Sequence, residues 1–235
     1  MVLLMKRILI AALAFLASAT PAAAAERRFS VTDFDRVQVE GPYQVVLVTD
    51  RPSAALAVGS REAIDRVSID VQSRTLRIRP NRSAWGGYPG ESAGPVRIEL
   101  ATRLLRAATV NGSGSLAIDK ARGLRVELSV AGSGRLGVAM LDADVLIVGL
   151  LGSGKVTLAG RAKQLRATIQ GTGDLAARDL RAENAQINAD TAGSIAVGAG
   201  RTAKVTATGQ GDVEIVGTPA CTVVGHSAAQ VSCGR

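Results

Sequence analysis

Two aspartates occupy equivalent positions in a repeated sequence pattern and are the first candidates for acid–base chemistry. Asp174 and Asp212 each follow directly after a Gly-x-Gly step, and one further copy of the pattern lies between them. If successive copies pair as neighbouring strands, the two carboxylates would lie two strand spacings apart, about 9.6 Å. That distance approaches the spacing of the carboxylate pair in inverting glycosidases. The neighbouring residues indicate neither a cleft nor a metal, and we interpret both aspartates as solvated surface carboxylates.

Other residues that could do chemistry are isolated along the chain. His226 is the single histidine, and the serine or cysteine partner that nucleophilic catalysis would require is not evident. A second type of metal ligand at a suitable spacing is also missing from the sequence around His226. The glycine-rich steps are flanked by strand-like sequence on both sides, which excludes a phosphate-binding loop. We therefore predict a protein without a catalytic site, a metal or a cofactor.

The two cysteines, Cys221 and Cys233, both lie near the C-terminus. An exported protein carries its cysteines into an oxidising compartment, which favours a disulfide. A disulfide that closes a loop of about a dozen residues stabilises a fold by about 3 kcal/mol in the chain-entropy model. The alternative is a pair of free, buried thiols.

A Gly-x-Gly step begins at residues 112, 132, 152, 171, 191 and 209, and Thr191 replaces the first glycine of the degenerate fifth copy. Every second residue around each step is apolar or glycine, which is the period of a β-strand. The alternation continues through the step, which predicts that both glycines face inward. Glycine inside a strand marks a bend. The predicted column of corners consists of Gly112, Gly114, Gly132, Gly134, Gly152, Gly154, Gly171, Gly173, Gly193, Gly209 and Gly211.

A fixed repeat of this length is typical of a solenoid, in which each coil buries its apolar face against its neighbours. We predict an all-β fold, a single-stranded right-handed parallel β-helix (β-solenoid) with coils of about 20 residues. An antiparallel meander or sandwich also fits the alternation, but it predicts hairpin turns in place of a fixed coil length.

The repeat pattern also predicts how the chain is divided. Residues 1–25 are expected to be a signal peptide and residues 26–235 a single domain. Within that domain, residues 26–100 are expected to form less regular coils, with residues 26–40 covering one end. About three such coils fit between a repeat-like segment at residues 37–47 and the first Gly-x-Gly coil. Regular coils are expected over residues 101–217, and residues 218–235 are expected to form a C-terminal cap.

The start of the chain has the pattern of an export signal. Lys6 and Arg7 precede an apolar run and a small-residue stretch that ends at Ala25. A membrane anchor is the alternative, but the apolar run is shorter than the ~20 residues of a spanning helix. We expect an exported protein in the periplasm or on the cell surface of a Gram-negative bacterium, with no transmembrane segment after the signal is removed. The sequence does not indicate an oligomeric state.

Basic residues form a second period along the chain. Arginines recur at Arg103, Arg122, Arg161, Arg181 and Arg201, with Asp142 in the slot between Arg122 and Arg161. Stacked along one corner, they would form a basic ridge that either solvent or an anionic partner must screen. The full chain has a net charge of +8, which falls by two when Lys6 and Arg7 are removed. Nucleic acid is an unsuitable partner for an exported protein, so an anionic glycan, lipopolysaccharide or an envelope protein is expected.

Two further surfaces could contact a partner. The residues between the paired glycines form a polar row, which could meet a sugar or simply solvate a tight corner: Ser113, Ser133, Ser153, Thr172, Ala192 and Gln210. A Gly/Ser/Pro-rich loop at residues 81–95 contains Trp85 and Tyr88. Aromatic residues on such a loop can anchor a partner or pack against the solenoid wall.

Four segments of the chain together resemble a known family. They are FDRVQVEGPYQVVLV near the start, then SIDVQSRTLRIRP, the GSGSL-type repeats, and GTPACTVVGHSAAQVSCG near the end. This order is similar to that of the GIN domain family, also called domain of unknown function 2807 and labelled an auto-transporter adhesin head. The resemblance covers nearly all of residues 26–235. It implies an exported bacterial β-helical protein and supplies no catalytic residues.

These observations favour a non-enzymatic protein of the cell envelope that presents a rigid surface for binding or adhesion. A periplasmic structural or assembly factor is the alternative. A polysaccharide-active enzyme is a third hypothesis, which rests only on the chemistry of other β-helices.

Overall fold

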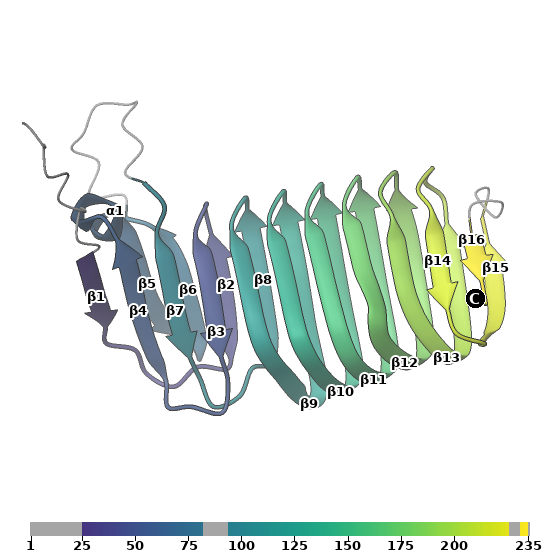
Figure 1. Ribbon diagram of the computed structural model, residues 1–235, viewed down its shortest axis with the longest axis horizontal. Helices are drawn as coiled ribbons and strands as arrows, with labels where there is room; N and C mark the ends of the chain where they lie inside the picture. Colours follow the sequence, from purple (N-terminus) through teal and green to yellow (C-terminus); the bar gives the residue numbers. More distant parts are fainter. Residues whose placement is uncertain (1–24, 82–93, 226–230, 235) are drawn as a thin grey trace, which may run out of the picture.

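The computed structural model describes residues 25–81, 94–225 and 231–234, which form an elongated β-solenoid of about six turns (Figure 1). The long strands β9 (Ser115–Gly132), β10 (Arg135–Gly152), β11 (Lys155–Gly171) and β12 (Asp174–Thr191) pair in parallel with one another. Equivalent residues one repeat apart are direct partners, as Leu116 is with Leu136. The predicted parallel solenoid and its coil length are therefore confirmed.

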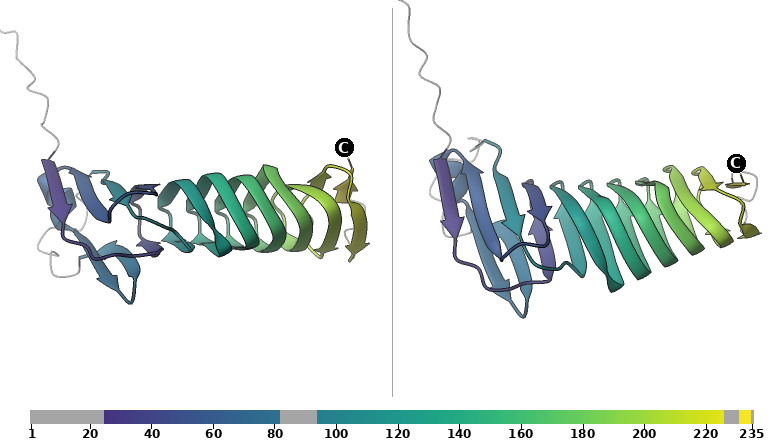
Figure 2. Two further views of the ribbon diagram at one scale, coloured as in Figure 1. Left: turned by 90° about the horizontal axis from the view of Figure 1, so that it is seen from below. Right: turned by 60° about the horizontal axis from the view of Figure 1, so that its bottom comes forward.

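Each long strand bends about halfway along, so that it contributes to two opposite faces of the solenoid (Figure 2). The first face contains the N-terminal halves of these strands, and the second face contains their C-terminal halves. The faces meet at two edges. The glycine edge contains the Gly-x-Gly steps, and the charged edge contains the bends near residues 120–124, 140–144, 160–163 and 180–183. The stack continues with β8 (Ala107–Gly112) on one side and with β13 (Ile195–Ala207), β14 (Val213–Val216), β15 (Ala220–Val224) and β16 (Val231–Cys233) on the other.

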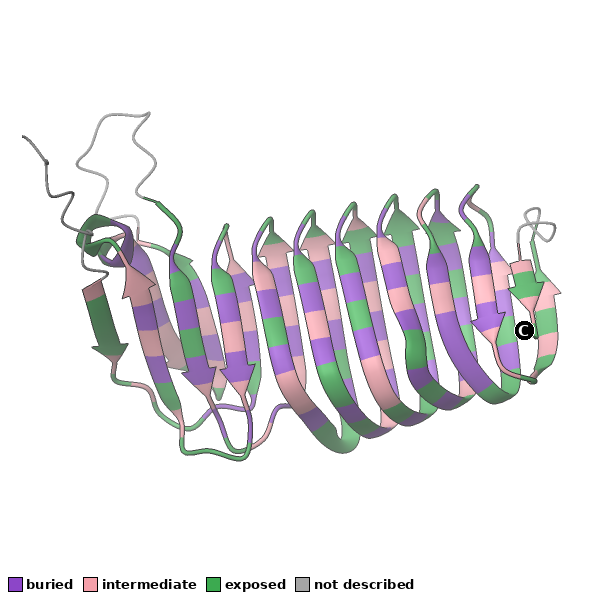
Figure 3. Cartoon of the chain, viewed as in Figure 1, coloured by how far each residue is buried: buried purple, intermediate pink, exposed green. Residues whose placement is uncertain are grey.

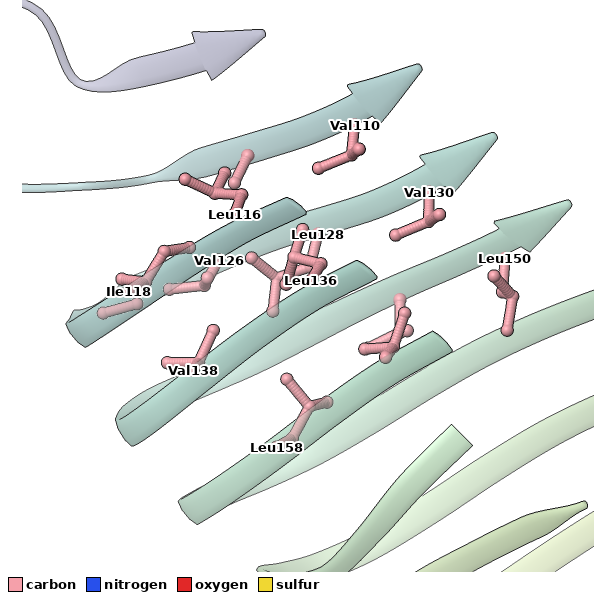
Figure 4. Packing of buried hydrophobic residues seen from close by; sticks show 14 of the residues in the cluster. Val110, Leu116, Ile118, Val126, Leu128, Val130, Leu136, Val138, Leu150 and Leu158 are labelled. Carbon is pink, nitrogen blue, oxygen red and sulfur yellow. The ribbon is translucent and has the colours of Figure 1, made fainter. Parts of the chain in front are cut away.

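The interior is an aliphatic column between the two faces. Away from the bends, burial alternates along β9 to β12, and the buried positions carry mainly Val, Leu, Ile and Ala (Figure 3). Equivalent side chains stack from coil to coil, as Val110, Val130 and Leu150 do, and all three are at most 2% exposed (Figure 4). A single coil could not bury such a stripe alone, so the core is shared between neighbouring coils.

The N-terminal strands do not follow the expected order. They are β1 (Ala25–Phe29), β2 (Arg36–Glu40), β3 (Gln44–Val48), β4 (Ala54–Gly59), β5 (Val67–Gln72), β6 (Thr75–Pro80) and β7 (Arg97–Ala101). Strands β2 and β3 pair directly with β8 and β9, although about 70 residues separate them. The prediction of about three coils between these segments is therefore wrong.

After β3, the chain instead runs away from the regular coils, and it returns to them at β8. Strands β6 and β7 form one further coil on the outer side of β2 and β3. Beyond that coil, β5 pairs antiparallel with β6, and β4 pairs antiparallel with β7 and β1. The tight link between β5 and β6 explains the reversal, because Ser73 and Arg74 both have positive φ, as a two-residue hairpin turn requires.

The outermost strands and one short helix form the N-terminal cap. Strand β1 lies at the edge of the first face, and helix α1 (Arg61–Asp65) buries Ala63 and Ile64. The side chain of Ser60 accepts a hydrogen bond from the backbone N–H of Ala63 and so starts the helix. The expected cover at residues 26–40 is only partly correct, because residues 36–40 are a strand of the first coil.

Asp35 joins the three parts of this rearranged region. Its carboxylate accepts a hydrogen bond from Arg74 in the β5–β6 turn and lies 3.8 Å from the Nε of Arg106 in the returning chain. Its backbone carbonyl also accepts the N–H of Arg106. The carboxylate is only 9% exposed, whereas the side chains of Arg74 and Arg106 are 64% and 62% exposed.

The predicted disulfide between Cys221 and Cys233 is confirmed, with a Cα–Cα distance of 6.6 Å. Cys221 is the register partner of Ala203 on the second face, and Cys233 is that of Ile215 on the first face. The bond therefore links the two faces across the interior of the last coil. The expected C-terminal cap is thus a shortened coil that continues the parallel stack.

Candidate binding surfaces

The glycine edge is held by backbone hydrogen bonds that pass from coil to coil. The N–H of Ser133 donates to the carbonyl of Gly112, and the N–H of Arg135 donates to the carbonyl of Gly114. The same two bonds recur at the next corner, from Ser153 and Lys155. The side chains of the polar row, including Ser133 and Ser153, are exposed at this edge.

The two glycines of each step have different environments. Gly134 is buried, as predicted, but Gly132 is exposed, so the prediction that both glycines face inward is wrong for the first one. Gly132 has φ +112°, which glycine adopts without strain. A Cβ on Gly134 would lie 2.7 Å from the carbonyl oxygen of Gly114 in the preceding coil. A Cβ on Gly132 would also lie only 2.8 Å from the carbonyl oxygen of Gly112. Both glycines therefore permit close stacking of the coils, and the first also supplies a backbone angle.

Thr191, which replaces a first glycine, is 3% exposed. Its hydroxyl accepts a hydrogen bond from the N–H of Gly193 at 2.9 Å and lies 3.4 Å from the carbonyl of Gly173. The side chain of Thr191 therefore replaces part of the backbone hydrogen bonding at this corner.

The aspartates that suggested acid–base chemistry lie in one row on the first face. Asp174 is the register partner of Lys155, and Asp212 lies two coils further along, beyond Ser194. The carboxylate of Asp174 accepts the backbone N–H of Ser194 at 3.0 Å. This contact gives Asp174 a structural role at the turn of the next coil.

The arginines of the second period gather at the charged edge but do not form a uniform ridge. Arg122, Asp142, Arg161 and Arg181 are successive register partners. Arg161 donates to both carboxylate oxygens of Asp142, at 2.8 and 2.7 Å. This hydrogen bonding lowers the pKa of Asp142 below its ordinary value. The carboxylate thus neutralises one of the two arginines that flank it.

Most of the other basic residues at this edge are also paired. Arg122 donates to both oxygens of Asp50 at 2.6 Å, which lowers the pKa of that carboxyl. Lys163 lies 2.8 Å from Asp144, and this hydrogen bond raises the pKa of the lysine. Arg201 lies 3.9 Å from Glu183, whereas Arg181 has no ion-pair partner among the residues that the structure describes. Arg103 lies in the returning chain, where its carbonyl accepts the N–H of Asp50.

A groove of about 770 Å³ lies beside the charged edge, where the returning chain meets the first regular coil. We call it the edge groove. Its basic lining residues are Arg36, Arg106, Arg122 and Arg125, and its apolar ones include Leu104 and Leu124. Leu124 is 79% exposed, which is unusual for a large aliphatic side chain in a strand.

The arginines of the edge groove differ in their pairing. Arg122 is held by Asp50, and Arg125 contacts Glu127 at 2.6 Å. Arg36 forms no ion pair with any described residue, and Arg106 reaches Asp35 only at 3.8 Å. Arg36 pairs in register with Ala107, the neighbour of Arg106. Unused guanidinium donors therefore collect at the cap side of the groove.

Several predicted candidates lie outside the described residues. They are Trp85 and Tyr88 in the loop at residues 81–95 and the single histidine, His226. Within residues 25–81, 94–225 and 231–234, three or more potential metal ligands do not cluster anywhere. A helix of sufficient length and apolarity to span a membrane is also absent from these ranges.

A family model described as "Putative auto-transporter adhesin, head GIN domain" matches residues 33–219. The chain belongs to the GIN domain family. The resemblance found in the sequence is confirmed, and the family description indicates an adhesin-like protein of the cell surface or envelope. No curated protein matches the chain significantly.

Solved structures share the fold of this GIN domain. A "putative adhesin" from Bacteroides fragilis has a TM-score of 0.78 and 17% identity, over 91% of this chain and 98% of the other. A "putative lipid binding protein" from Parabacteroides distasonis has a TM-score of 0.70 and 21% identity, over 91% and 97% of the two chains. A "putative adhesin" from the same species has a TM-score of 0.65 and 20% identity, over 90% and 97%. At identities this low, the structural similarity establishes the shared fold alone.

No sequence motif marks the residues that join the cap of this GIN domain to its regular coils. Asp119 accepts hydrogen bonds from both the backbone N–H and the hydroxyl of Thr49, which lies 70 residues earlier. Asp50 and Asp35 make similar connections across the chain reversal. None of these aspartates recurs with the coil period, so only the reversed strand order brings their partners close.

Proposed function

We propose that this GIN domain is an exported, non-enzymatic protein of the cell envelope that presents a rigid surface for adhesion to an acidic glycan. The observation that carries the proposal is the edge groove, where Arg36 and Arg106 have unused donors beside the apolar Leu104 and Leu124. The family description supports the adhesin-like part of this proposal.

The chemistry of the groove suits a polymer that carries carboxylate or sulfate groups. A guanidinium presents a planar set of donors that matches such anions in a bidentate geometry. Leu104 and Leu124 offer apolar area against which the C–H face of a sugar ring can pack. Arginine is also one of the residue types that most often contribute strongly to binding.

Rigidity supports the same function. The groove lies on a surface held by parallel strand pairing from β8 through β10, so its arginines project from ordered backbone. A preorganised surface loses little conformational entropy when a partner binds. The groove lining contains three carboxylates, and each is paired with a basic residue other than Arg36: Glu127, Asp142 and Asp144. The positive charge of Arg36 is therefore uncompensated.

A glycan array that contains neutral, uronic-acid and sulfated polysaccharides tests the proposal, with lipopolysaccharide as a further probe. We expect binding to acidic polymers that weakens at high salt. The variant Arg36→Glu should lose this binding. Arg135→Glu is the matched control, because Arg135 is exposed on β10 outside the groove and is unpaired among the described residues. Binding confined to neutral glycans, or equal loss in both variants, would contradict the proposal.

A second candidate function is that of a structural or assembly factor for another envelope protein. It is favoured by the second half of β10, where the outward positions carry the large apolar residues Val145, Ile147 and Leu151 together with Gly149. Leu151 is 56% exposed, and neighbouring coils carry mainly polar residues at these positions. Exposed apolar surface of this kind often marks a protein contact. A Leu151→Lys variant that keeps glycan binding but fails to rescue an envelope-assembly defect would favour this candidate.

A further inference from the structure

The N-terminal cap carries a second groove on the first face. It has a volume of about 600 Å³ and is lined by residues of β1, β3, β4 and β7 together with the segments that follow β1 and β3. We call it the cap groove. It shares no lining residue with the edge groove, so what it binds is independent of the proposed function.

The floor of the cap groove is apolar. Along β4, Ala55 and Ala57 point into the core, which leaves Leu56 on the outer side of the sheet. Val31, Val48 and Ala101 join Leu56 in the lining, and all are only partly buried. An outward sheet position is normally polar when it meets water. Val31 also packs against the core. Leu56, Val48 and Ala101 therefore form the part of this floor that is open to a partner.

Two arginines flank this floor and have no compensating charge. Arg28 is the register partner of Leu56, and Arg51 lies in the segment that follows β3. Neither forms an ion pair within the described part of the chain, whereas the nearby Arg27 pairs with Asp65. The carboxylate in the lining, Glu99, is 3.2 Å from Arg97.

We propose that the cap groove binds a single-chain amphiphile with an anionic headgroup, such as an alkyl phosphate or a long-chain carboxylate. The chain lies on the floor formed by Leu56 and Val48, and the headgroup contacts Arg28 and Arg51. The groove volume is within the range of small-molecule sites, which combine apolar walls with a few polar groups that fix orientation. The excess positive charge excludes a cationic amphiphile.

Isothermal titration calorimetry of the purified protein with dodecyl phosphate, kept below its critical micelle concentration, measures the binding and tests the inference. We expect saturable binding of one molecule per chain. Inorganic phosphate alone should bind at least 10-fold more weakly, because it leaves the apolar floor uncovered. Dodecyltrimethylammonium should not bind measurably. Equal affinity for dodecyl phosphate and inorganic phosphate, or no saturable binding of dodecyl phosphate, would overturn the inference.

Variants locate the binding to this groove. The double variant Arg28→Gln, Arg51→Gln should weaken dodecyl phosphate binding at least 10-fold, and Leu56→Asn should weaken it without changing the response to inorganic phosphate. Both arginines are exposed, so the double variant should retain its circular dichroism spectrum and melting temperature. Arg135→Gln is the control for general charge effects and should bind normally. Equal weakening in Arg135→Gln would overturn the inference.

Two further measurements separate this inference from the proposed function. The double variant should retain binding to acidic glycans, and Arg36→Glu should retain binding to dodecyl phosphate. Anionic bilayer vesicles should compete only weakly with dodecyl phosphate, because the groove takes one chain. Vesicle binding that depends on Arg28 and Arg51 as strongly as dodecyl phosphate binding does would contradict a single-chain ligand.

Discussion

The backbone N–H of Arg135 donates to the carbonyl oxygen of Gly114, one coil earlier, at 2.9 Å. The same bond recurs from Lys155 to Gly134 and from Asp174 to Gly154. These bonds form a ladder along the glycine edge as far as Asp174, and at the next corner the N–H of Ser194 donates to the carboxylate of Asp174 instead. The ladder brings successive corners so close that the second glycine of each step has no room for a side chain.

Gly134→Ala should therefore destabilise the protein by about 1–3 kcal/mol, as overpacking usually does. The added methyl group would lie 2.7 Å from the carbonyl oxygen of Gly114, so the two coils must move apart. Urea denaturation followed by circular dichroism measures the change in the free energy of unfolding. Gly137→Ala is the control, because a Cβ at that position meets no atom within 4 Å. Equal destabilisation by both substitutions would show that corner spacing is not the cause.

The ion pair between Asp142 and Arg161 should be visible in a carboxyl titration. Its hydrogen bonds lower the pKa of Asp142 from the ordinary value of 3.8. The folded state is therefore favoured by this group above the ordinary pKa, and that contribution is lost as the pH falls through the lowered pKa. NMR titration should find the lowered pKa, and Arg161→Gln should return it toward the ordinary value.

The stabilisation by this pair should be small, because both side chains are at least half exposed and salt screens them. Raising the salt concentration should reduce the pKa shift of Asp142. A shift that survives both Arg161→Gln and high salt would contradict the pairing.

Asp35→Ala should destabilise the junction between the cap and the regular coils. The substitution leaves Arg74 and Arg106 without their shared, largely buried carboxylate, and hydrogen bonds to charged groups contribute about 1.5–3 kcal/mol. Thermal unfolding is a direct measurement. Asp65→Ala is the control, because its pair with Arg27 is more than half exposed and should contribute at most about 1 kcal/mol. A smaller destabilisation by Asp35→Ala than by Asp65→Ala would contradict the role of Asp35 at the junction.

Loss of the disulfide should loosen the C-terminal end first. Cys221→Ser with Cys233→Ser should cost about 3 kcal/mol in the chain-entropy model. Hydrogen exchange should show reduced protection in β15 and β16, because the bond joins the two faces only at the last coil. Protection in β9 and β10 should change much less, since they are several coils away. A uniform loss of protection along the solenoid would contradict this local role.

The sequence predicts the regular coils well because their structure is local and periodic. Val110, Val130 and Leu150 stack as their spacing requires, and the corners occur at the Gly-x-Gly steps. The alternation does not predict the exposure of Gly132, because the strand pattern breaks at the corner, where this glycine has a positive φ.

The cap could not be predicted in the same way. Its order depends on a two-residue turn at Ser73 and Arg74, which lacks the Asn-Gly or Asp-Gly sequence that usually marks such a hairpin. Once the chain reverses there, Arg36 lies beside the returning segment that contains Arg106. The two grooves depend on that arrangement, and no sequence period indicates either of them.

Direct titration of polygalacturonate against the purified protein tests the central claim, that the edge groove binds acidic glycans. We predict saturable binding that Arg36→Glu weakens at least 10-fold while Arg135→Glu leaves it unchanged. Binding that is absent from the wild-type protein, or that both variants weaken equally, would contradict the claim.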